Sequence, residues 1–378
     1  MQFGMSKEKQ KRVSVYLKAG EKAATSYYRF YQYFRQIDAK VKFNLMIPDS
    51  KWNAFFPIAS QPKWKQVYIF FYIYFRVLWN LIVDVIRKPD VVVISRCIIN
   101  KVLPYSYILL LNSLKRRGCE IVWDFDDNIV GAEMTRKNFD WFSSYANLII
   151  VGSPTLKELI NKKYQEKVAL LPTTDGDMHE RLTEEIKEKR TAEFDNVIRI
   201  IWVGTFSTLN YVRDIAPAIE KAGKRFKEYK KELHLIVVCD KTLDCETDNF
   251  VLHNVKWEKE VAINQMLQAH VGIMPLEDNE VTRGKCGFKL IQYLSVGLPV
   301  IGSTVGMNQT IINDKIGIGV DEVDGESWTN AIISIASDAP KWATQSENAY
   351  KEWELKYNVS YNLNEWNKII NQDIYVRN

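Results

Sequence analysis

Cysteine and histidine are scarce in this 378-residue chain, and neither residue type is arranged as a ligand set. The five cysteines are scattered and form no CxxC pair, so the sequence indicates neither a disulfide framework nor a zinc ribbon. The four histidines have no metal-ligand spacing, and the zinc pattern HExxH is absent. We therefore expect free thiols in a reducing compartment, and a zinc hydrolase has no support.

Two common phosphate-binding patterns are also missing. GxxxxGK[ST] fails around Lys285, because Asn279 stands in place of the first glycine and Cys286 in place of the Ser or Thr. The dinucleotide pattern GxGxxG fails because Glu322 occupies the third glycine position after GIG. A protein kinase is therefore unsupported, and phosphate binding, if present, must use other residues.

Charge of one sign is not in large excess. Lys and Arg number 51 against 46 Asp and Glu, a net charge of +5, and no long basic tract is present. This balance is too mild to indicate a nucleic-acid-binding protein, and we expect no nucleic acid as a partner. It suits anionic small molecules or a membrane surface.

Long uninterrupted apolar runs are absent as well. Residues 1–17 lack the apolar stretch of a secretory signal, so we expect a cytoplasmic protein. Residues 67–86 approach the length of a membrane span, but Arg76, Asn80 and Asp84 interrupt them at helical spacing. We favour a core helix. The alternative is a peripheral helix at the inner face of the membrane, since the stretch is flanked by Lys63, Lys65, Arg87 and Lys88.

Short apolar strands alternate with amphipathic helices along most of the chain. The length fits two domains, and the strands are apolar on both faces, which predicts an α/β fold with parallel sheets covered on both sides. A charged segment at 175–196 separates two such series. The predicted strands are 12–17, 90–95, 120–125, 148–153 and 168–173 in the first series, and 197–204, 233–239, 250–257, 271–276, 299–303 and 316–320 in the second.

The second series contains two segments suited to binding an anion. In WVGTFSTLNYV (202–212), a strand runs into Gly204 and then into the hydroxyl residues Thr205, Ser207 and Thr208 before a helix. A helix start presents unpaired N–H groups to an anion, although hydroxyl residues are also ordinary helix caps.

The other segment, RGKCGFKLIQYL, places three cations in seven residues. Arg283, Lys285 and Lys289 stand beside a predicted helix start, where like charges repel unless a multivalent anion sits between them. We expect a diphosphate there, rather than a solvated basic loop.

The segment VGIMPLEDNEVTRGKCGFKLIQYLSVGLPVIGSTVGMNQTII (271–312) resembles the donor-binding half of GT-B glycosyltransferases, in particular the retaining family 4 enzymes. The resemblance extends to 202–212 and, more loosely, to YYRFYQYF (27–34) and WDFDD (123–127). It implies two Rossmann-like doubly wound domains facing each other across a cleft. The predicted boundaries are 1–192 for the acceptor-side domain, 193–354 for the nucleotide-sugar domain, and 355–378 for a C-terminal helix that returns to the first domain.

The resemblance also implies roles for single residues. Arg283, Lys285 and Lys289 would hold the diphosphate, and we assign Arg283 and Lys289 to catalysis. The loop from Gly204 to Thr208, including Thr205 and Ser207, would approach the donor. Gln292 stands where the family has a ribose-binding carboxylate, and Gly284 where many members have a glutamate near the sugar. Asp278, Glu280 or Glu277 would replace that glutamate, and Cys239 and Trp257 are expected near the nucleobase.

On the acceptor side the candidates are Asp126, Asp127, Tyr28 and Arg29. Asp124 and Asp126 also form a DxD pattern after a strand, which is typical of metal-dependent GT-A glycosyltransferases and gives the main alternative. A non-catalytic partner of another transferase is the second alternative, motivated by Gln292 and Gly284.

The combined prediction is a retaining, metal-independent glycosyltransferase of surface glycan and polysaccharide biosynthesis. It would use a UDP- or GDP-linked sugar as substrate, a saccharide or lipid-linked acceptor, and no further cofactor. A peripheral contact with the inner face of the membrane is the further partner that the segment 63–88 suggests.

Overall fold

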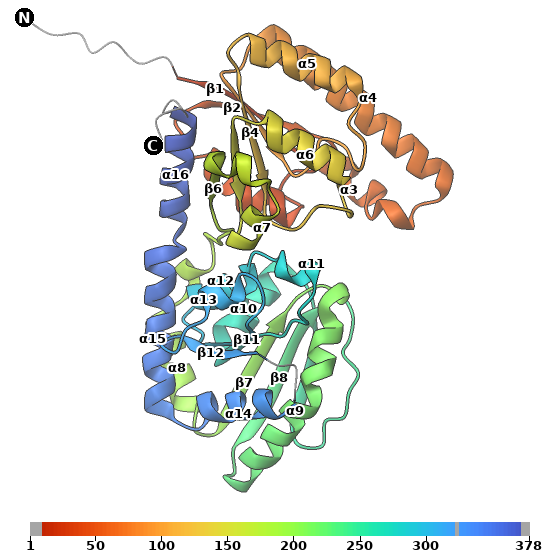
Figure 1. The fold of residues 1–378 in the computed structure, drawn as a ribbon. Coiled ribbons are helices and arrows are strands. Elements are labelled where there is room, and N and C mark those ends of the chain that lie inside the picture. The colour runs from red at the N-terminus through yellow and green to blue at the C-terminus, as the bar shows by residue number, and fades with distance from the viewer. Residues whose placement is uncertain (1–9, 322–324, 372–378) are drawn as a thin grey trace, which may run out of the picture. The chain divides into compact units, whose positions relative to one another are not determined.

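The computed structural model describes residues 10–321 and 325–371, which divide into two compact units (Figure 1). The first unit comprises the described parts of 1–173 and 359–378, and the second comprises those of 174–358. Each unit contains a six-stranded, fully parallel sheet.

In the first unit the strand order is β2-β1-β3-β4-β5-β6. The chain starts at β1, adds β2 on one side, and then crosses back to build the rest of the sheet on the other side. The strands are β1 (Arg12–Leu17), β2 (Lys40–Leu45), β3 (Val91–Ser95), β4 (Glu120–Phe125), β5 (Leu148–Val151) and β6 (Val168–Leu170).

Helices cover both faces of this sheet, because successive buried side chains of each strand point to opposite sides. One face packs on α4, α5 and α6, and the other on α2 and α16. The helices and helical turns of this unit are α1 (Ala24–Ser26), the π-helical η1 (Tyr27–Tyr31), α2 (Gln32–Phe34), α3 (Asp49–Phe55), η2 (Ile58–Ser60), α4 (Lys63–Arg87), α5 (Tyr105–Arg116), α6 (Arg136–Tyr145), α7 (Pro154–Glu158), η3 (Lys162–Lys167) and α16 (Val359–Asn371).

In the second unit the strand order is β12-β11-β10-β7-β8-β9. The first strand in sequence, β7, is again in the interior, with β8 on one side and β10 on the other. The strands are β7 (Val197–Val203), β8 (Glu232–Cys239), β9 (Val251–Lys256), β10 (Val271–Met274), β11 (Val300–Ser303) and β12 (Gly317–Val320).

This sheet also lies between two apolar clusters, one formed with α9 and α14 and the other with α10, α12 and α15. Side-chain caps fix several helix starts: Thr183 caps α8, and Asp338 caps α15. The helices and helical turns are η4 (His179–Arg181), α8 (Glu184–Glu193), η5 (Phe206–Thr208), α9 (Leu209–Glu228), α10 (Lys259–Gln268), α11 (Glu280–Arg283), α12 (Phe288–Ser295), α13 (Asn308–Ile311), α14 (Gly325–Ala336) and α15 (Ala339–Lys356).

The unit boundary differs from the predicted one at residue 192. Residues 174–193 pack with the second unit: Arg190 Nη1 donates to the Val296 carbonyl at 3.0 Å. Directly after them, the ring of Phe194 stacks on Trp342 with a centroid distance of 4.6 Å. The returning helix is α16, which begins at Val359 rather than 355, and residues 372–378 of the predicted helix lie outside the described residues.

Every predicted strand is present, and one strand was missed. The missed strand is β2, at the edge of the first sheet, whose sequence KVKFNL mixes charged and apolar residues. Its side chains are mostly half-exposed, so it lacks the continuous apolar run by which the interior strands were recognised.

Candidate functional site

The strand order of the second sheet brings two loops together at its carboxyl edge. β7 and β10 are neighbouring parallel strands that run in register, Val271 beside Ile200 and Gly272 beside Ile201, while the chain leaves them in opposite directions. This is the switch point at which open parallel sheets bind ligands. The loop after β7 (204–208) and the loop after β10 (275–279) start at this point.

The loop after β7 is shaped by Gly204. A Cβ atom at this position would lie 2.3 Å from the ring of Trp202, so only glycine fits. The backbone N–H of Phe206 donates to Asp240 Oδ1 at 3.2 Å, which ties the loop to the end of β8. Thr205 and Ser207 are exposed, and their hydroxyl oxygens lie 2.8 Å apart.

The hydroxyl residues do not act as the helix caps that their type suggests. Thr208 is the N-cap residue of α9, but its hydroxyl donates to the Thr205 carbonyl at 3.2 Å. Among the described residues no side chain caps the first turn of this 20-residue helix. The turn η5 precedes the helix directly, and the Leu209 N–H, the first of α9, donates to the Phe206 carbonyl. The start of α9 therefore lacks a side-chain cap, and the positive end of its helix dipole faces the loop after β7.

α12 is anchored directly beneath this loop. The Val203 N–H donates to the hydroxyl oxygen of Tyr293 at 3.0 Å, and Tyr293 is completely buried, which raises the pKa of its hydroxyl. Gly272 makes room for the ring, since a Cβ there would lie 2.3 Å from Tyr293 Cδ2. Gly287, with φ of 68°, begins the helix in a left-handed conformation. The packing thus sets the start of α12 relative to the loop after β7.

The three predicted cations are not equivalent. Arg283 is exposed and forms an ion pair with Asp278, with Nε to Oδ1 at 2.5 Å and Nη2 to Oδ2 at 2.8 Å. The hydrogen bonds from Arg283 lower the pKa of Asp278. Lys285 and Lys289 are half-buried at the two sides of Gly287. One cation is therefore already neutralised by a carboxylate that was predicted to contact the sugar.

The other carboxylate candidates in this loop are exposed. Glu280 begins α11, whose start is fixed by a capping box between Asn279 and Thr282. Glu277 accepts a hydrogen bond from the Asn279 side-chain amide at 3.3 Å. Of these acids, Glu280 is the one that faces solvent from the first turn of a helix, where a negative charge is stabilised.

Gln292 has a partner that the sequence did not indicate. Its side-chain amide nitrogen donates to Asp175 Oδ2 at 2.8 Å and to Met178 Sδ at 3.7 Å. Both N–H groups are thus directed within the protein, and the carbonyl oxygen is the polar atom left for a ribose. Asp175 is fully buried and also accepts the N–H of Asp177 at 2.9 Å; burial raises the pKa of Asp175. Asp175 lies in the charged segment 175–196 that separates the two predicted series, 117 residues before Gln292, and no pattern in the sequence indicates its burial.

The two residues predicted to lie near the nucleobase, Cys239 and Trp257, differ in exposure. Cys239 is buried at the end of β8, inside an apolar cluster, so its side chain is not exposed to a base, and its place near the nucleobase stays a prediction. Trp257, just beyond β9, is 51% exposed, and its backbone N–H donates to the Cys239 carbonyl at 3.1 Å. This bond fixes the backbone of Trp257 at the sheet edge, and the exposed indole ring has surface available for stacking.

In the first unit, Arg29 and Asp124 form a buried ion pair. Arg29 Nε donates to Asp124 Oδ1 at 2.8 Å, and its Nη1 donates to the Leu171 carbonyl at 2.9 Å and to Thr173 Oγ1 at 3.0 Å. Both charged side chains are almost completely inaccessible. Arg29 is therefore a structural residue and not an acceptor contact, contrary to the prediction.

Arg96 organises a second charged cluster at the carboxyl ends of β3 and β4. It pairs with Asp126 at 2.7 Å, with Asp127, and with Glu133 at 3.1 Å. Asp126 is buried, and the adjacent Arg96 lowers its pKa against the opposing effect of burial. Asp126 is thus not free to contact an acceptor, while Asp127 is 43% exposed.

The same contacts argue against the alternative of a metal-dependent GT-A enzyme that uses Asp124 and Asp126. Asp124 and Asp126 each accept hydrogen bonds from an arginine, so the DxD pattern is part of two ion-pair networks. The fold, with two parallel sheets, is also not GT-A. Tyr28, the remaining acceptor-side candidate, is half-buried on η1, where its ring meets Tyr27 edge to face at 5.0 Å.

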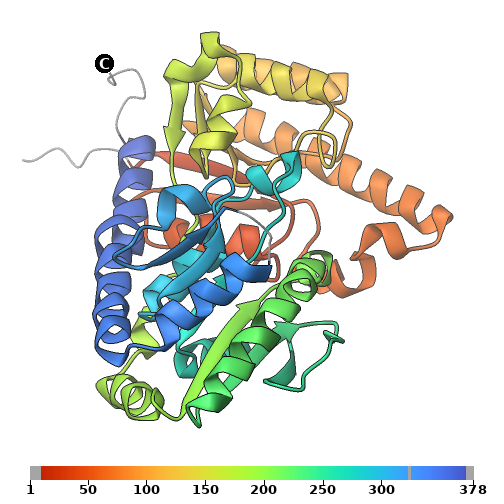
Figure 2. The ribbon, with the colours of Figure 1, turned by 60° about the horizontal axis from the view of Figure 1, so that its bottom comes forward.

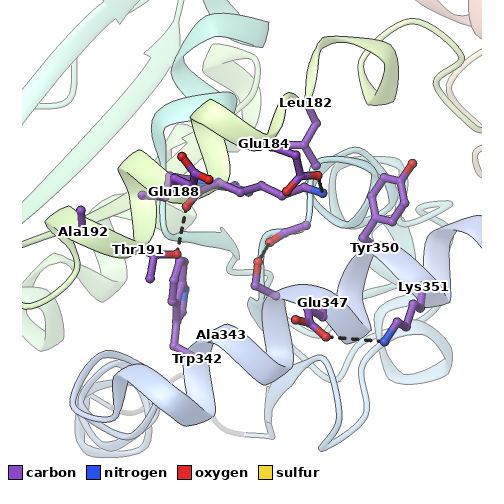
Figure 3. Close-up of a pocket in the computed structure, with 14 residues that line it drawn as sticks. Leu182, Glu184, Glu188, Thr191, Ala192, Trp342, Ala343, Glu347, Tyr350 and Lys351 are labelled. Atoms are coloured by element: carbon purple, nitrogen blue, oxygen red, sulfur yellow. Dashed lines mark hydrogen bonds and ion pairs between the residues drawn. The ribbon is translucent and has the colours of Figure 1, made fainter.

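A separate pocket of about 620 Å³ lies between α8 and α15 (Figure 3). Glu184, Lys187 and Thr191 line one side, and Trp342 and Glu347 line the other. None of its lining residues comes from a loop that follows a strand at the carboxyl edge, among those that the structure describes. The pocket does not bring together any of the predicted site residues.

Comparison with known proteins identifies a family in the second unit. Residues 197–338 match the model of the family Glycosyl transferases group 1, and this range contains both loops at the switch point and all of α12. No curated protein sequence matches the chain. The match places a glycosyl transferase domain in the second unit.

Solved structures establish the fold of the whole chain. Anabaena Alr3699/HepE in complex with UDP has a TM-score of 0.67 at 10% identity, covering 96% of this chain and 100% of that one. The catalytic domain of starch synthase IV from Arabidopsis thaliana, bound to ADP and acarbose, has a TM-score of 0.66 at 10% identity, covering 97% and 100%. Sucrose-phosphate synthase from Thermosynechococcus elongatus has 0.61 at 12% identity, covering 96% and 99%. The chain has a GT-B fold with two Rossmann-like units, and it is a glycosyltransferase.

Proposed function

We propose that this glycosyltransferase moves a sugar from a nucleoside diphosphate donor to a saccharide or lipid-linked acceptor in surface glycan biosynthesis, in the cytoplasm. The observation that carries the proposal is the family match over residues 197–338, which includes the uncapped start of α9 and the basic segment before α12. Both lie at or beside the switch point of the second sheet. These are the parts of the chain best suited to hold a diphosphate.

The reaction requires stabilisation of a leaving group more than a protein nucleophile. When the bond between sugar and diphosphate breaks, negative charge increases on the diphosphate oxygens. Lys285, Lys289 and the positive ends of the α9 and α12 helix dipoles would stabilise this charge more strongly than that of the bound donor. These groups are fixed before the reaction, so little reorganisation is needed. The mechanism we propose uses no metal, because protein cations supply the compensating charge. We propose retention of the anomeric configuration on the resemblance to the retaining family 4 enzymes.

Arg283 would join this set by exchanging partners. In the structure its guanidinium is held by Asp278, at the exposed end of α11. A diphosphate offers the same bidentate acceptor geometry with more charge, so it would compete for Arg283 and release the Asp278 carboxylate. The released Asp278, or the exposed Glu280, would then be available to the sugar hydroxyls.

For the donor base we place uridine first. The HepE structures contain UDP or UDP-glucose, while the starch synthase structure contains ADP. An exposed Trp257 would stack on a base without selecting it, so GDP-linked sugars stay in the proposal. On the acceptor side Asp127 is the one predicted residue that combines charge with substantial exposure.

A thermal-shift panel tests the donor proposal. Purified protein is heated with UDP, GDP, ADP and their sugar conjugates, and one nucleoside diphosphate should raise the melting temperature clearly more than its monophosphate, because the second phosphate reaches the basic segment. Release of that diphosphate from the sugar conjugate is then measured with and without EDTA. Activity that persists in EDTA supports the mechanism without metal. Failure of every nucleoside diphosphate to bind would instead favour a non-catalytic partner of another transferase.

A further inference from the structure

α4 has an apolar outward face along its whole length. Eight of its side chains are large, apolar and exposed, and they recur at intervals of mostly three or four residues, which places them on one side of the helix. Trp64, Phe75 and Trp79 are 72%, 61% and 65% exposed. The outward face comprises Trp64, Val67, Tyr68, Phe71, Phe75, Trp79, Ile82 and Ile86.

α5 continues this surface. It lies against α4, where the hydroxyl of Tyr107 donates to the Tyr74 carbonyl at 2.8 Å and Arg117 donates to the Val85 carbonyl at 2.7 Å. The two helices run side by side, and α4 extends beyond the start of α5 (Figures 1 and 2). Tyr105 and Leu109 on α5, with Val102 before it, are exposed apolar residues. These three and the outward face of α4 form what we call the α4–α5 surface.

The polar residues of α4 do not interrupt this surface. Arg76 is half-buried and donates to the Leu45 carbonyl at 2.7 Å. Asp84 is fully buried and accepts hydrogen bonds from Tyr16 and Lys42. Between Val67 and Ile86 every exposed side chain is therefore apolar, although a solvent-facing helix surface is normally polar.

The opposite side of α4 excludes a membrane-spanning helix. Ile69, Ile73, Val77 and Leu81 belong to the apolar core of the first unit. The helix is long and apolar enough to cross a bilayer, but a span would expose the sheet and remove these contacts. A surface of this kind can be covered only from outside, with the helix lying flat along its roughly 37 Å length.

The charges around the α4–α5 surface indicate the chemistry of the partner that binds it. Exposed cations border it at both ends of α4 and at the end of α5: Lys63, Arg87, Lys88, Arg116 and Arg117. Residues 63–117 contain only two acidic residues, the buried Asp84 and Asp90, which is ion-paired with Arg12. The exposed aromatics include Trp and Tyr, which prefer the headgroup region of a bilayer.

We propose that the α4–α5 surface docks on an anionic lipid bilayer, with the aromatic side chains inserted at the headgroup boundary and the bordering cations on lipid phosphates. A second copy of the chain is a poorer partner, because a two-fold interface would bring the cationic borders of both copies together. The proposal concerns a different surface from the donor site and does not depend on the donor.

Vesicle flotation of the full chain tests the proposal. Wild-type protein should float with phosphatidylcholine–phosphatidylglycerol vesicles, and clearly less with phosphatidylcholine alone or in high salt. The Phe75→Glu/Trp79→Glu variant should partition at least roughly tenfold less, because two inserted rings are lost. Lys63→Gln and Arg87→Gln should each weaken binding to anionic vesicles about fivefold.

Matched variants in the second unit control for charge and surface polarity. Tyr229→Glu/Leu355→Glu replaces two apolar side chains of similar exposure, and Lys221→Gln/Lys224→Gln removes two exposed cations from α9. Both should bind vesicles like wild type. Circular dichroism and nucleotide-induced thermal shift confirm that each variant is folded.

Four results would overturn the proposal. The first is wild-type protein that stays in solution with all vesicles, and the second is undiminished flotation of Phe75→Glu/Trp79→Glu. The third is a dimer in sedimentation analysis that this double variant converts to monomer while vesicles remain unbound, which would assign the surface to self-association. Membrane association that resists carbonate extraction would likewise replace docking by a spanning helix.

Discussion

The hydroxyl oxygen of Tyr293 accepts the backbone N–H of Val203 at 3.0 Å, and this contact joins the helix that carries Lys289 to the strand that leads into Gly204. Both partners are buried. The contact relates the two segments that the donor proposal assigns to the diphosphate.

Tyr293→Phe should therefore destabilise the second unit and weaken nucleotide binding. The buried Val203 N–H would lose its acceptor, at a cost of about 1–3 kcal/mol in the free energy of unfolding. Urea denaturation measures the loss, and titration with UDP measures the binding. Tyr350→Phe, on the half-buried face of α15, is the control and should change neither quantity. Equal stability of Tyr293→Phe and wild type would contradict the assigned role.

Lys289→Ala tests the diphosphate assignment directly. Loss of a charge-assisted hydrogen bond to phosphate should weaken nucleoside diphosphate binding about tenfold or more, with little effect on the monophosphate. Isothermal titration calorimetry with both nucleotides gives the comparison. Lys221→Ala, an exposed lysine on α9, is the control. If Lys289→Ala binds the diphosphate as wild type does, Lys289 has no part in holding it.

The Arg283–Asp278 pair predicts opposite effects of two substitutions. Arg283→Ala should weaken diphosphate binding, because a cation is lost. Asp278→Asn should strengthen it by about twofold to fivefold, because Arg283 then binds the diphosphate without first breaking its ion pair with the Asp278 carboxylate. In the Arg283→Ala background, Asp278→Asn should lose this effect. Strengthening that persists in the double variant would show that Asp278 acts independently of Arg283.

The buried Arg29–Asp124 pair is expected to matter for stability. Asp124→Asn leaves the Arg29 charge buried without its counterion, which should cost about 3–5 kcal/mol in the first unit. Arg29→Met/Asp124→Leu should be less destabilising than the sum of the two single substitutions. The control is the exposed pair of Arg181 and Glu260, where Glu260→Gln should cost under about 1 kcal/mol. Similar losses in the free energy of unfolding for Asp124→Asn and Glu260→Gln would contradict the stabilising role of the buried ion pair.

His270 makes the second unit sensitive to acid. Its Nδ1 accepts the Arg199 N–H at 3.0 Å, its Nε2–H donates to the Arg190 carbonyl at 3.1 Å, and burial lowers its pKa from 6.5 to about 3. The folded protein therefore holds His270 neutral, while the unfolded chain binds a proton below pH 6.5. Stability is fully present above that pH and is lost as the pH falls toward 3.

Comparison with His270→Gln isolates this effect. The variant should be less stable at neutral pH, because a fully buried and doubly hydrogen-bonded ring is replaced. The difference in the free energy of unfolding between wild type and the variant should then decrease by up to about 1.4 kcal/mol for each pH unit between about pH 6 and 4. Denaturation at several pH values gives both curves. A difference that stays constant with pH would contradict a neutral buried His270.

Much of the fold followed from local patterns in the sequence. Interior strands such as 120–125 and 148–151 are apolar on both faces, and this requirement of a covered parallel sheet is written into consecutive residues. The same holds for the Gly204 loop and the glycines before α12. For α4 the sequence predicted an apolar helix but not its exposed aromatic face. Periodicity shows that apolar residues lie on two sides of the helix, but it does not show which side packs on the sheet.

The sequence by itself determined the alternation of strands and helices, the two α/β units, and the segments that carry the basic and glycine residues, because each depends on neighbours within a few positions. Only the tertiary structure decided the partners of the charged groups. Arg29 meets Asp124 across 95 residues and Gln292 meets Asp175 across 117. Such contacts depend on strand order and on which side chains become buried, and a buried charge must find a partner wherever the fold places one.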